Sequence, residues 1–302
     1  IKMATHRTYY IFRESYWVFQ AKMFAPPIQF TEESTTLIFA WITPENLKHG
    51  QDFHKYYYGD LANKLDLHGE RVAIVPIILR EVPYHQTLSL MRGTRLPTLV
   101  PHSFVGIWEL LRAVIYSSSK IPLPTALPRL SDMDVSRLVE EDLTQHWIGN
   151  GAADALLMSA MVRTWAKQRV PIRRIIYIFE NQPYERALIH QMRRSYPDVT
   201  LVAYQHVGVA PMRLQVQMAP GGEPEAPQPD FTFTIGDHNA RLLLANGHCQ
   251  ERVKLSGALQ MEGLSRLRAH SRDALPQYEV QILIALSFNL EEAAELAEMA
   301  TT

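Results

Sequence analysis

The sequence has little cysteine, no charge bias and no long apolar run. Cys249 is the only cysteine among 302 residues, so an intrachain disulfide is excluded and a reducing cytoplasm is the simplest setting. The formal net charge of -1 gives no global electrostatic reason to bind nucleic acid. Apolar runs stay below the length that spans a bilayer, and the first residues lack the pattern of a secretory signal. We therefore expect a cytoplasmic protein that binds no nucleic acid.

The common metal and phosphate motifs are also missing. Twelve histidines are present, but no C-x-x-C or H-E-x-x-H spacing accompanies them, so a zinc site is not expected. The glycines form neither a G-x-G-x-x-G nor a P-loop pattern, and we interpret Gly236 and Gly257 as tight turns between strands and helices. No metal and no resident cofactor are expected.

What the sequence does contain is an alternation of strand-like and helix-like segments. Apolar residues make up 47% of the chain, enough for a substantial core. "TTLIFAWIT" from Thr35 predicts a strand, residues 50–69 an amphipathic helix closed by Gly69, and "RVAIVPIIL" from Arg71 a second strand. This order indicates parallel pairing through a right-handed crossover, and strands that are apolar on both faces are typical of a sheet covered by helices. The predicted fold class is α/β, a Rossmann-like doubly wound parallel sheet.

The remaining segments follow the same rhythm less regularly. The opening run "RTYYIFRESYWVFQAKMF" is rich in aromatic residues, and we interpret it as an irregular strand or a short N-terminal cap. A mobile surface loop is expected at residues 219–229, which are rich in proline, glycine and glutamate. Helices are expected at residues 103–119, from Asp134 to Arg169 with a break near Gly149-Asn150-Gly151, and at 184–195 and 238–247; strands are expected at 173–180, 199–207, 230–237 and 252–259.

Three parts of the chain are distinguished by composition. We predict an N-terminal extension at residues 1–34, a Rossmann-like domain at 35–270, and a linker with the first β-α unit of a truncated second α/β domain at 271–302. This last part holds the strand-like run "EVQILIALS" and the helix-like run "NLEEAAELAEMA". The sequence starts without methionine and ends within the helix-like run, so we expect a fragment of a longer chain.

Polar residues stand where the central strands are predicted to end. Three consecutive strand ends are followed by Glu180, Asn181 and Gln182, by Gln205 and His206, and by Gly236 and Asp237. In an open parallel sheet the carboxyl ends of the strands face the crevice where ligands bind. A carboxylate or an imidazole placed there can take a proton from a hydroxyl, and amides can orient it.

Structural interpretations of the same residues remain open. Glu180 can interact with the dipole of the following helix, and Asn181 can be its N-cap. His206 can be an interior histidine whose hydrogen bonds are satisfied. Glu185 and Arg186 are interpreted as exposed residues of the first helical turn rather than as site residues.

The combination of "IIYIFENQPYER", "AYQHVGVAP", "PQPDFTFTIGDHNARLLLANGH" and "RVKLSGAL" resembles the N-terminal half of bacterial surface-polysaccharide glycosyltransferases of the GT-B type. It is also similar to their Kdo-transferring and glycerophosphotransferase branches. The resemblance covers about residues 35–290 and implies two Rossmann-like domains around a cleft. The first binds a glycan or lipid-linked acceptor, and the second binds a nucleotide-sugar donor as co-substrate, without an obligatory metal.

The resemblance also implies roles for particular residues. Glu180 or His206 would be the catalytic base that activates the acceptor. The acceptor-binding residues would be Asn181, Gln182, Gln205, Gly236 and Asp237, and the donor-binding residues would be Ser287 and Asn289. Peripheral association with the inner face of the membrane follows from a lipid-linked acceptor. Two alternatives stay open, namely a non-hydrolysing sugar-nucleotide epimerase and a non-catalytic domain that binds a glycan or a partner.

Overall fold

The structure is a computed structural model. It describes residues 2–26, 33–79, 82–117, 129–130, 133–148, 151–209, 216, 218 and 227–262. The β-α unit predicted at residues 271–302, with Ser287 and Asn289, lies outside the described residues, as does most of the loop predicted at 219–229. Ile1–Glu262 form one compact unit.

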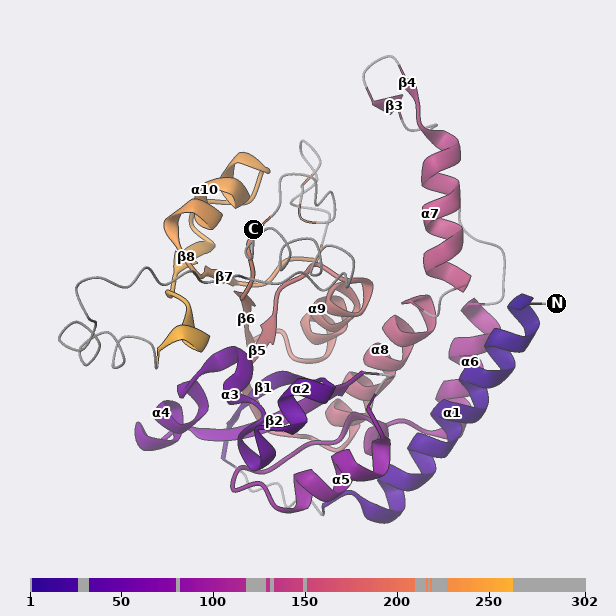
Figure 1. Ribbon diagram of the computed structural model, residues 1–302, viewed down its shortest axis with the longest axis horizontal. Helices are drawn as coiled ribbons and strands as arrows, with labels where there is room; N and C mark the ends of the chain where they lie inside the picture. The colour runs from indigo at the N-terminus through magenta and orange to yellow at the C-terminus, as the bar shows by residue number, and fades with distance from the viewer. Residues whose placement is uncertain are drawn as a thin grey trace, which may run out of the picture. The chain divides into compact units, whose positions relative to one another are not determined.

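A parallel sheet of six strands, in the order β2-β1-β5-β6-β7-β8, forms the centre of this unit (Figure 1). The strands are β1 (Thr35–Ile42), β2 (Arg71–Ile78), β5 (Ile172–Ile178), β6 (Thr200–Gln205), β7 (Phe231–Thr234) and β8 (Val253–Leu255). A short antiparallel ladder of β3 (Arg129–Leu130) and β4 (Met133–Asp134) is separate from the sheet. The predicted α/β class with a Rossmann-like parallel sheet is confirmed. The strand order reverses between β1 and β5, and such a switch point is where doubly wound sheets bind ligands.

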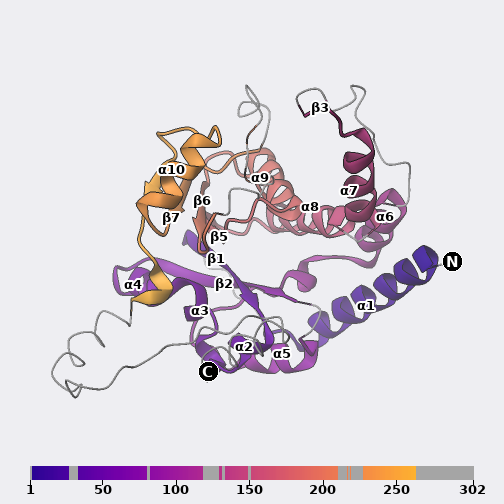
Figure 2. The same cartoon turned by 45° about the horizontal axis from the view of Figure 1, so that its top comes forward.

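Helices cover both faces of the sheet. They are α1 (Lys2–Phe24), α2 (Pro44–Leu47), α3 (Lys55–Tyr58), α4 (Leu61–Leu67), α5 (Tyr84–Arg92), α6 (Ile107–Ser117), α7 (Ser136–Ile148), α8 (Gly151–Lys167), α9 (Pro183–Ser195) and α10 (Asp237–Ala245), with the 3-10 turns η1 (Gly50–Asp52), η2 (Pro101–Phe104) and η4 (Leu259–Met261). Figure 2 shows α8 and α9 on one side of the sheet and α3 and α5 on the other. Among the described residues, no helix combines the length and the apolar character needed to cross a bilayer.

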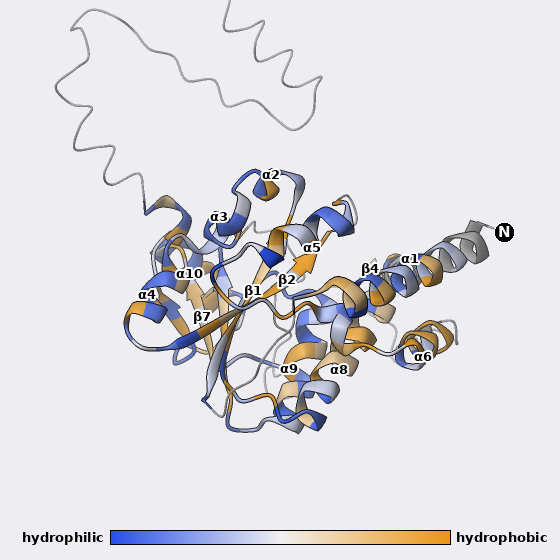
Figure 3. Cartoon of the chain, turned by 90° about the horizontal axis from the view of Figure 1, so that it is seen from below, coloured by the Kyte–Doolittle hydropathy of each residue, from blue (hydrophilic) through white to orange (hydrophobic). Residues whose placement is uncertain are grey.

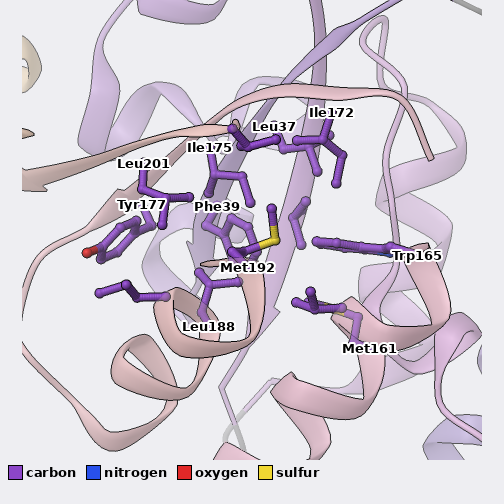
Figure 4. Close-up of a cluster of buried hydrophobic side chains, with 14 of the residues drawn as sticks. Leu37, Phe39, Met161, Trp165, Ile172, Ile175, Tyr177, Leu188, Met192 and Leu201 are labelled. Carbon is purple, nitrogen blue, oxygen red and sulfur yellow. The ribbon is translucent and has the colours of Figure 1, made fainter. Parts of the chain in front are cut away.

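The strands are apolar on both faces because each face has its own helical layer. Figure 3 shows the apolar colour along the central strands. Leu37 and Phe39 of β1 face the layer of α8 and α9, where they pack near Trp165 and Met192 (Figure 4). Ile38, between them in the sequence, belongs to the cluster on the opposite face. Complete burial of such a side chain contributes about 1.5–3 kcal/mol to folding.

The opening segment is a helix, so its interpretation as an irregular strand or a short cap was wrong. Helix α1 spans 23 residues, Lys2–Phe24. Its buried side chains include Tyr10, Glu14, Trp17 and Ala21, which recur at helical spacing on one face. Aromatic residues favour strands only weakly, and packing of this face onto the domain overrides that preference.

The helix predicted at residues 50–69 is interrupted, although its predicted end is confirmed. The single helix predicted at residues 50–69 is divided into η1, α3 and α4. Gly59 causes one break, because its φ of 52° and ψ of -132° are incompatible with a continuing helix. Gly69 does end the last piece, at φ 78° as expected for a C-terminal glycine. The break predicted near Gly149 lies outside the described residues, which include α7 up to Ile148 and α8 from Gly151.

Candidate functional site

The turn after β5 is organised by a carboxylate that the sequence interpretation placed in solvent. Glu185, in the first turn of α9, is 1% exposed. Its carboxylate accepts hydrogen bonds from the backbone N–H of Glu180 at 3.2 Å and of Asn181 at 2.9 Å. These bonds hold Asn181 in the left-handed region at φ 58°, a conformation that asparagine tolerates better than most residues. The predicted exposure of Glu185 was therefore wrong, whereas Arg186 is exposed as expected.

Burial changes the acidity of this carboxyl group. Loss of solvation raises the pKa of Glu185 to about 8, although the backbone N–H donors act in the opposite direction. At neutral pH the protonated form therefore predominates. The shape of the turn after β5 is thus coupled to a proton on a neighbouring helix.

The three residues of the turn have separate environments. Asn181 is buried, and its side-chain oxygen accepts a hydrogen bond from Nε of Arg186 at 3.0 Å. Gln182, rather than Asn181, is the N-cap residue of α9, and its side chain makes no capping bond. Glu180 is half-buried at the carboxyl end of β5. The N-cap interpretation of Asn181 was therefore wrong.

His206 and Glu180 both lie near Tyr57 of α3. The rings of Tyr57 and His206 meet edge to face, with their centroids 5.1 Å apart. Burial raises the pKa of Tyr57 to about 12, with further contributions from Tyr56 and from the negative charge of Glu180. His206 itself is 8% exposed. The structure thus brings the two residues predicted to be catalytic to one tyrosine that the sequence interpretation did not include.

Gln205 has a different environment from His206. Side chains alternate between the two faces of β6, so Gln205 is on the same face as Leu201 and Ala203, toward the layer of α8 and α9. His206 instead contacts Tyr57 of α3, on the other face. Gln205 is 2% exposed, and neither its amide oxygen nor its amide nitrogen has a hydrogen-bond partner within the described part of the chain. A buried amide without partners is costly, so this position favours a bound water or a ligand group.

The residues predicted at the end of β7, Gly236 and Asp237, contribute less to the candidate site. Gly236 is the N-cap residue of α10, with an extended backbone that any residue adopts. Asp237 is exposed and pairs with Arg241 at 2.6 Å, one turn further along α10. Its ionic partner therefore lies on its own helix rather than on β5 or β6. The structure does not bring Asp237 together with Glu180 and His206 through any described contact.

A cavity of about 240 Å³ lies at the same edge of the sheet, beside the switch point. Trp41 at the end of β1, Ile77 at the end of β2 and Tyr184 in the first turn of α9 form part of its wall. Helices α1 and α8 and the turn η2 close it with Arg13, Glu14, Trp17, His102, Asp154 and Met158. An apolar cavity with a few convergent polar groups at this position of a doubly wound sheet is the usual form of a small-molecule site.

The polar groups of the cavity make two sets of hydrogen bonds. Oε2 of Glu14 lies 3.0 Å from Nε2 of His102, and Nε of Arg13 donates to Oε1 of Glu14 at 3.0 Å. The hydroxyl of Tyr10 donates to Asp154 at 2.7 Å. Burial acts to raise the pKa of Glu14, but the bond from His102 and the charge of Arg13 outweigh it and lower the pKa. Glu14 is therefore an ionised carboxylate held in place beside the cavity.

Sequence interpretation missed this cluster and missed Glu185. Arg13 and Glu14 lie in the segment assigned to an extension, and His102 and Asp154 are 88 and 144 positions from Glu14 and Tyr10, their partners. Only the fold brings them together. Glu185 did carry a local signal, because it stands three residues after the N-cap Gln182, where a glutamate can reach back to the preceding backbone N–H groups.

In the described part of the chain, no group of three or more histidine, cysteine, aspartate or glutamate side chains has the arrangement of a metal site. No known protein-family model matches the sequence, and a comparison with curated proteins finds no relative. A doubly wound fold supports many unrelated activities, so the chemistry of the site is what indicates a function.

Proposed function

We propose that this chain supplies the acceptor-binding domain of a glycosyltransferase, which moves a sugar from a nucleotide sugar to a glycan or lipid-linked acceptor. The observation that supports it most is the position of Glu180. Its charge acts on Tyr57, which contacts His206, and also on Tyr184, which lines the cavity. Glu180 therefore stands after β5, close enough for its charge to act both on Tyr57, beside His206, and on Tyr184 in the cavity wall.

This position suits a general base for a sugar hydroxyl. The acceptor oxygen forms a bond to the anomeric carbon, the bond from that carbon to the phosphate oxygen breaks, and the nucleotide leaves with the electron pair. Glu180 takes the proton of the attacking hydroxyl as this occurs. Tyr57 and His206 supply hydrogen-bonding groups beside it, and the buried amide of Gln205 is a further group that a bound polar molecule can satisfy. Donor binding is assigned to the second domain predicted from residue 271 onward.

A donor screen tests the reaction. The full-length protein that contains this chain is incubated with CMP-, UDP- or GDP-sugars, with and without a lipid-linked or oligosaccharide acceptor, and nucleotide release is followed. Release that depends on the acceptor supports transfer. Isomerised sugar without release supports the epimerase instead, and binding of the acceptor without turnover supports the non-catalytic domain; either result overturns the proposal.

Substitutions test the residues once a donor is known. Glu180→Gln and His206→Ala are each expected to reduce transfer at least about a hundredfold, the scale of general acid-base groups. Glu45→Gln is a matched control, because Glu45 is exposed and its charge also acts on Tyr57. We expect it to change transfer less than about threefold, since exposed charges are screened by solvent. Full activity in both test variants would remove Glu180 and His206 from the site.

A further inference from the structure

Helix α1 exposes an unusual set of large apolar side chains. Five of them are 59–71% exposed and follow a spacing of three and four residues along one face: Tyr9, Phe12, Tyr16, Phe19 and Met23. This spacing places them in one stripe. The opposite face of α1 packs on the domain through Tyr10, Trp17 and Ala21, so large apolar side chains stand on both faces of the helix.

The neighbouring helix α6 also exposes large apolar side chains. Helices α1 and α6 pack on each other through Tyr10, Leu110 and Val114. Trp108 is 74% exposed on α6, and Ile115 is 70% exposed. Figure 3 shows both helices at one flank of the domain, with apolar stretches on each. We call the exposed side chains Tyr9, Phe12, Tyr16, Phe19, Met23, Trp108 and Ile115 the aromatic flank.

The fully exposed charges on the two helices of the aromatic flank are positive. On the described side chains of α1 and α6, the exposed charged groups are Lys22 and Arg112. Glu14 is buried in its cluster with His102, and Glu109 is half-buried. A third cation, Arg92, donates to the backbone oxygen of Phe24 at 2.8 Å at the end of α1. The surface is thus aromatic and basic.

The aromatic and basic character of the flank favours a lipid bilayer over a second copy of this chain as its binding partner. A symmetric pair of identical chains would put the same patch on both sides of the interface, so Lys22 and Arg112 would face further cations. Bilayer surfaces that contain anionic lipids complement the cations instead, and aromatic side chains favour the boundary between headgroups and acyl chains. The stripe from Tyr9 to Met23 covers about 21 Å along the helix at 1.5 Å per residue, enough for α1 to lie along such a surface.

We infer that the aromatic flank docks the domain on an anionic lipid bilayer, with α1 lying in the headgroup region. Phe12, Phe19 and Trp108 insert among the acyl chains nearest the headgroups, and Lys22 and Arg112 pair with lipid phosphates. The inference holds whatever reaction takes place at the carboxyl edge of the sheet.

Vesicle binding tests the inference directly. The full chain is incubated with phosphatidylcholine vesicles containing about a third phosphatidylglycerol, or with phosphatidylcholine alone, and the bound fraction is measured by flotation. We expect at least tenfold stronger binding to the anionic vesicles, with a decrease as salt increases. The double variant Phe12→Ser/Phe19→Ser is expected to lose at least tenfold in binding with an unchanged circular dichroism spectrum.

A matched control removes exposed apolar side chains elsewhere. Leu67 and Leu255 are 83% and 58% exposed, on α4 and β8. The variant Leu67→Ser/Leu255→Ser should bind vesicles like the unmodified chain. Equal binding to neutral vesicles, or unchanged binding of Phe12→Ser/Phe19→Ser, would overturn the inference. So would a chain that ignores vesicles but forms a dimer, seen by light scattering, that the same double variant dissociates.

Discussion

At the scale of single residues, the least ordinary group is the buried carboxyl of Glu185. It accepts hydrogen bonds from the backbone of Glu180 and Asn181, and burial raises its pKa to about 8. The proton on this group and the turn that presents Glu180 are therefore connected through two backbone N–H groups.

This raised pKa predicts a pH dependence of stability. In the unfolded chain Glu185 has its ordinary pKa of 4.5, and in the folded chain its pKa is about 8. Between these values the folded chain holds a proton that the unfolded chain has lost, so the free energy of unfolding falls as pH rises, by up to about 1.4 kcal/mol per pH unit. The stabilisation is complete below pH 4.5 and is lost as pH rises through 8.

Urea unfolding at pH 5, 6, 7 and 8 measures this slope. Glu185→Gln keeps the neutral shape of the protonated side chain, and we expect its slope to be shallower than that of the unmodified chain. Glu251→Gln changes an exposed carboxylate and should leave the slope as it is. A slope of wild-type size in Glu185→Gln would show that Glu185 is ionised over this range.

At the scale of elements, the sequence pattern predicted best where local signals and burial agree. The long strands β1 and β2 are continuous apolar runs, and such runs bounded by turn residues identify strands of a covered parallel sheet. The carboxyl ends of β1 and β2 were therefore also predicted correctly. Glu180 and His206 likewise follow β5 and β6, as the sequence predicted. In contrast, α1 was missed because its aromatic residues carry a strand preference that only tertiary packing reverses.

The contacts within the site were less predictable than the positions of its strands. The bond between Glu14 and His102 joins residues 88 positions apart, and no local pattern encodes it. The break at Gly59 was missed for a related reason. A glycine inside a helix-like pattern is tolerated in many helices, and the close packing of η4 against Gly59 is a tertiary contact that the sequence does not show.

Replacing Gly59 by alanine is expected to destabilise the domain more than the same change at Gly69. A side chain there would meet the backbone oxygen of Leu259 in η4, and its φ of 52° disfavours other residues. Gly69 has a similar positive φ of 78°, but nothing lies within 4 Å of a Cβ placed there. We expect Gly69→Ala to cost about 1 kcal/mol from strain alone. Gly59→Ala should cost a further 1–3 kcal/mol or so from the backbone collision.

The comparison is made by urea unfolding of the two variants under one set of conditions. Equal losses of unfolding free energy would indicate that η4 moves away from Gly59 without cost. In that case the packing of α3 on η4 would add nothing to the stability of the domain.

At the scale of the whole described unit, helix α1 is part of the fold rather than an appendage. It packs on α5, on α6 and on the turn η2. Trp17 stacks on Tyr84 of α5 with ring centroids 4.8 Å apart and meets the ring of His102 edge to face. One side chain of α1 thus joins two other segments and also lines the cavity.

Two tryptophans test this role. Trp17→Ala removes a side chain that is 8% exposed, and we expect a loss of about 3–5 kcal/mol in unfolding free energy. Trp108→Ala removes one that is 74% exposed, with an expected change within about 0.5 kcal/mol. Thermal and urea unfolding followed by circular dichroism measure both. Similar small losses would mean that α1 is attached only loosely.

Helix α1 also separates two environments. It presents Glu14 and Trp17 to the cavity, and it presents Phe12 and Phe19 to solvent on its other side. Any ligand that shifts this helix therefore moves both the side chains that line the cavity and the side chains exposed to solvent. If lipid contact alters the affinity of the cavity by some factor, an occupant of the cavity must alter the affinity for lipid by the same factor. Helix α1 would then couple ligand binding in the cavity to lipid binding at the aromatic flank, in both directions.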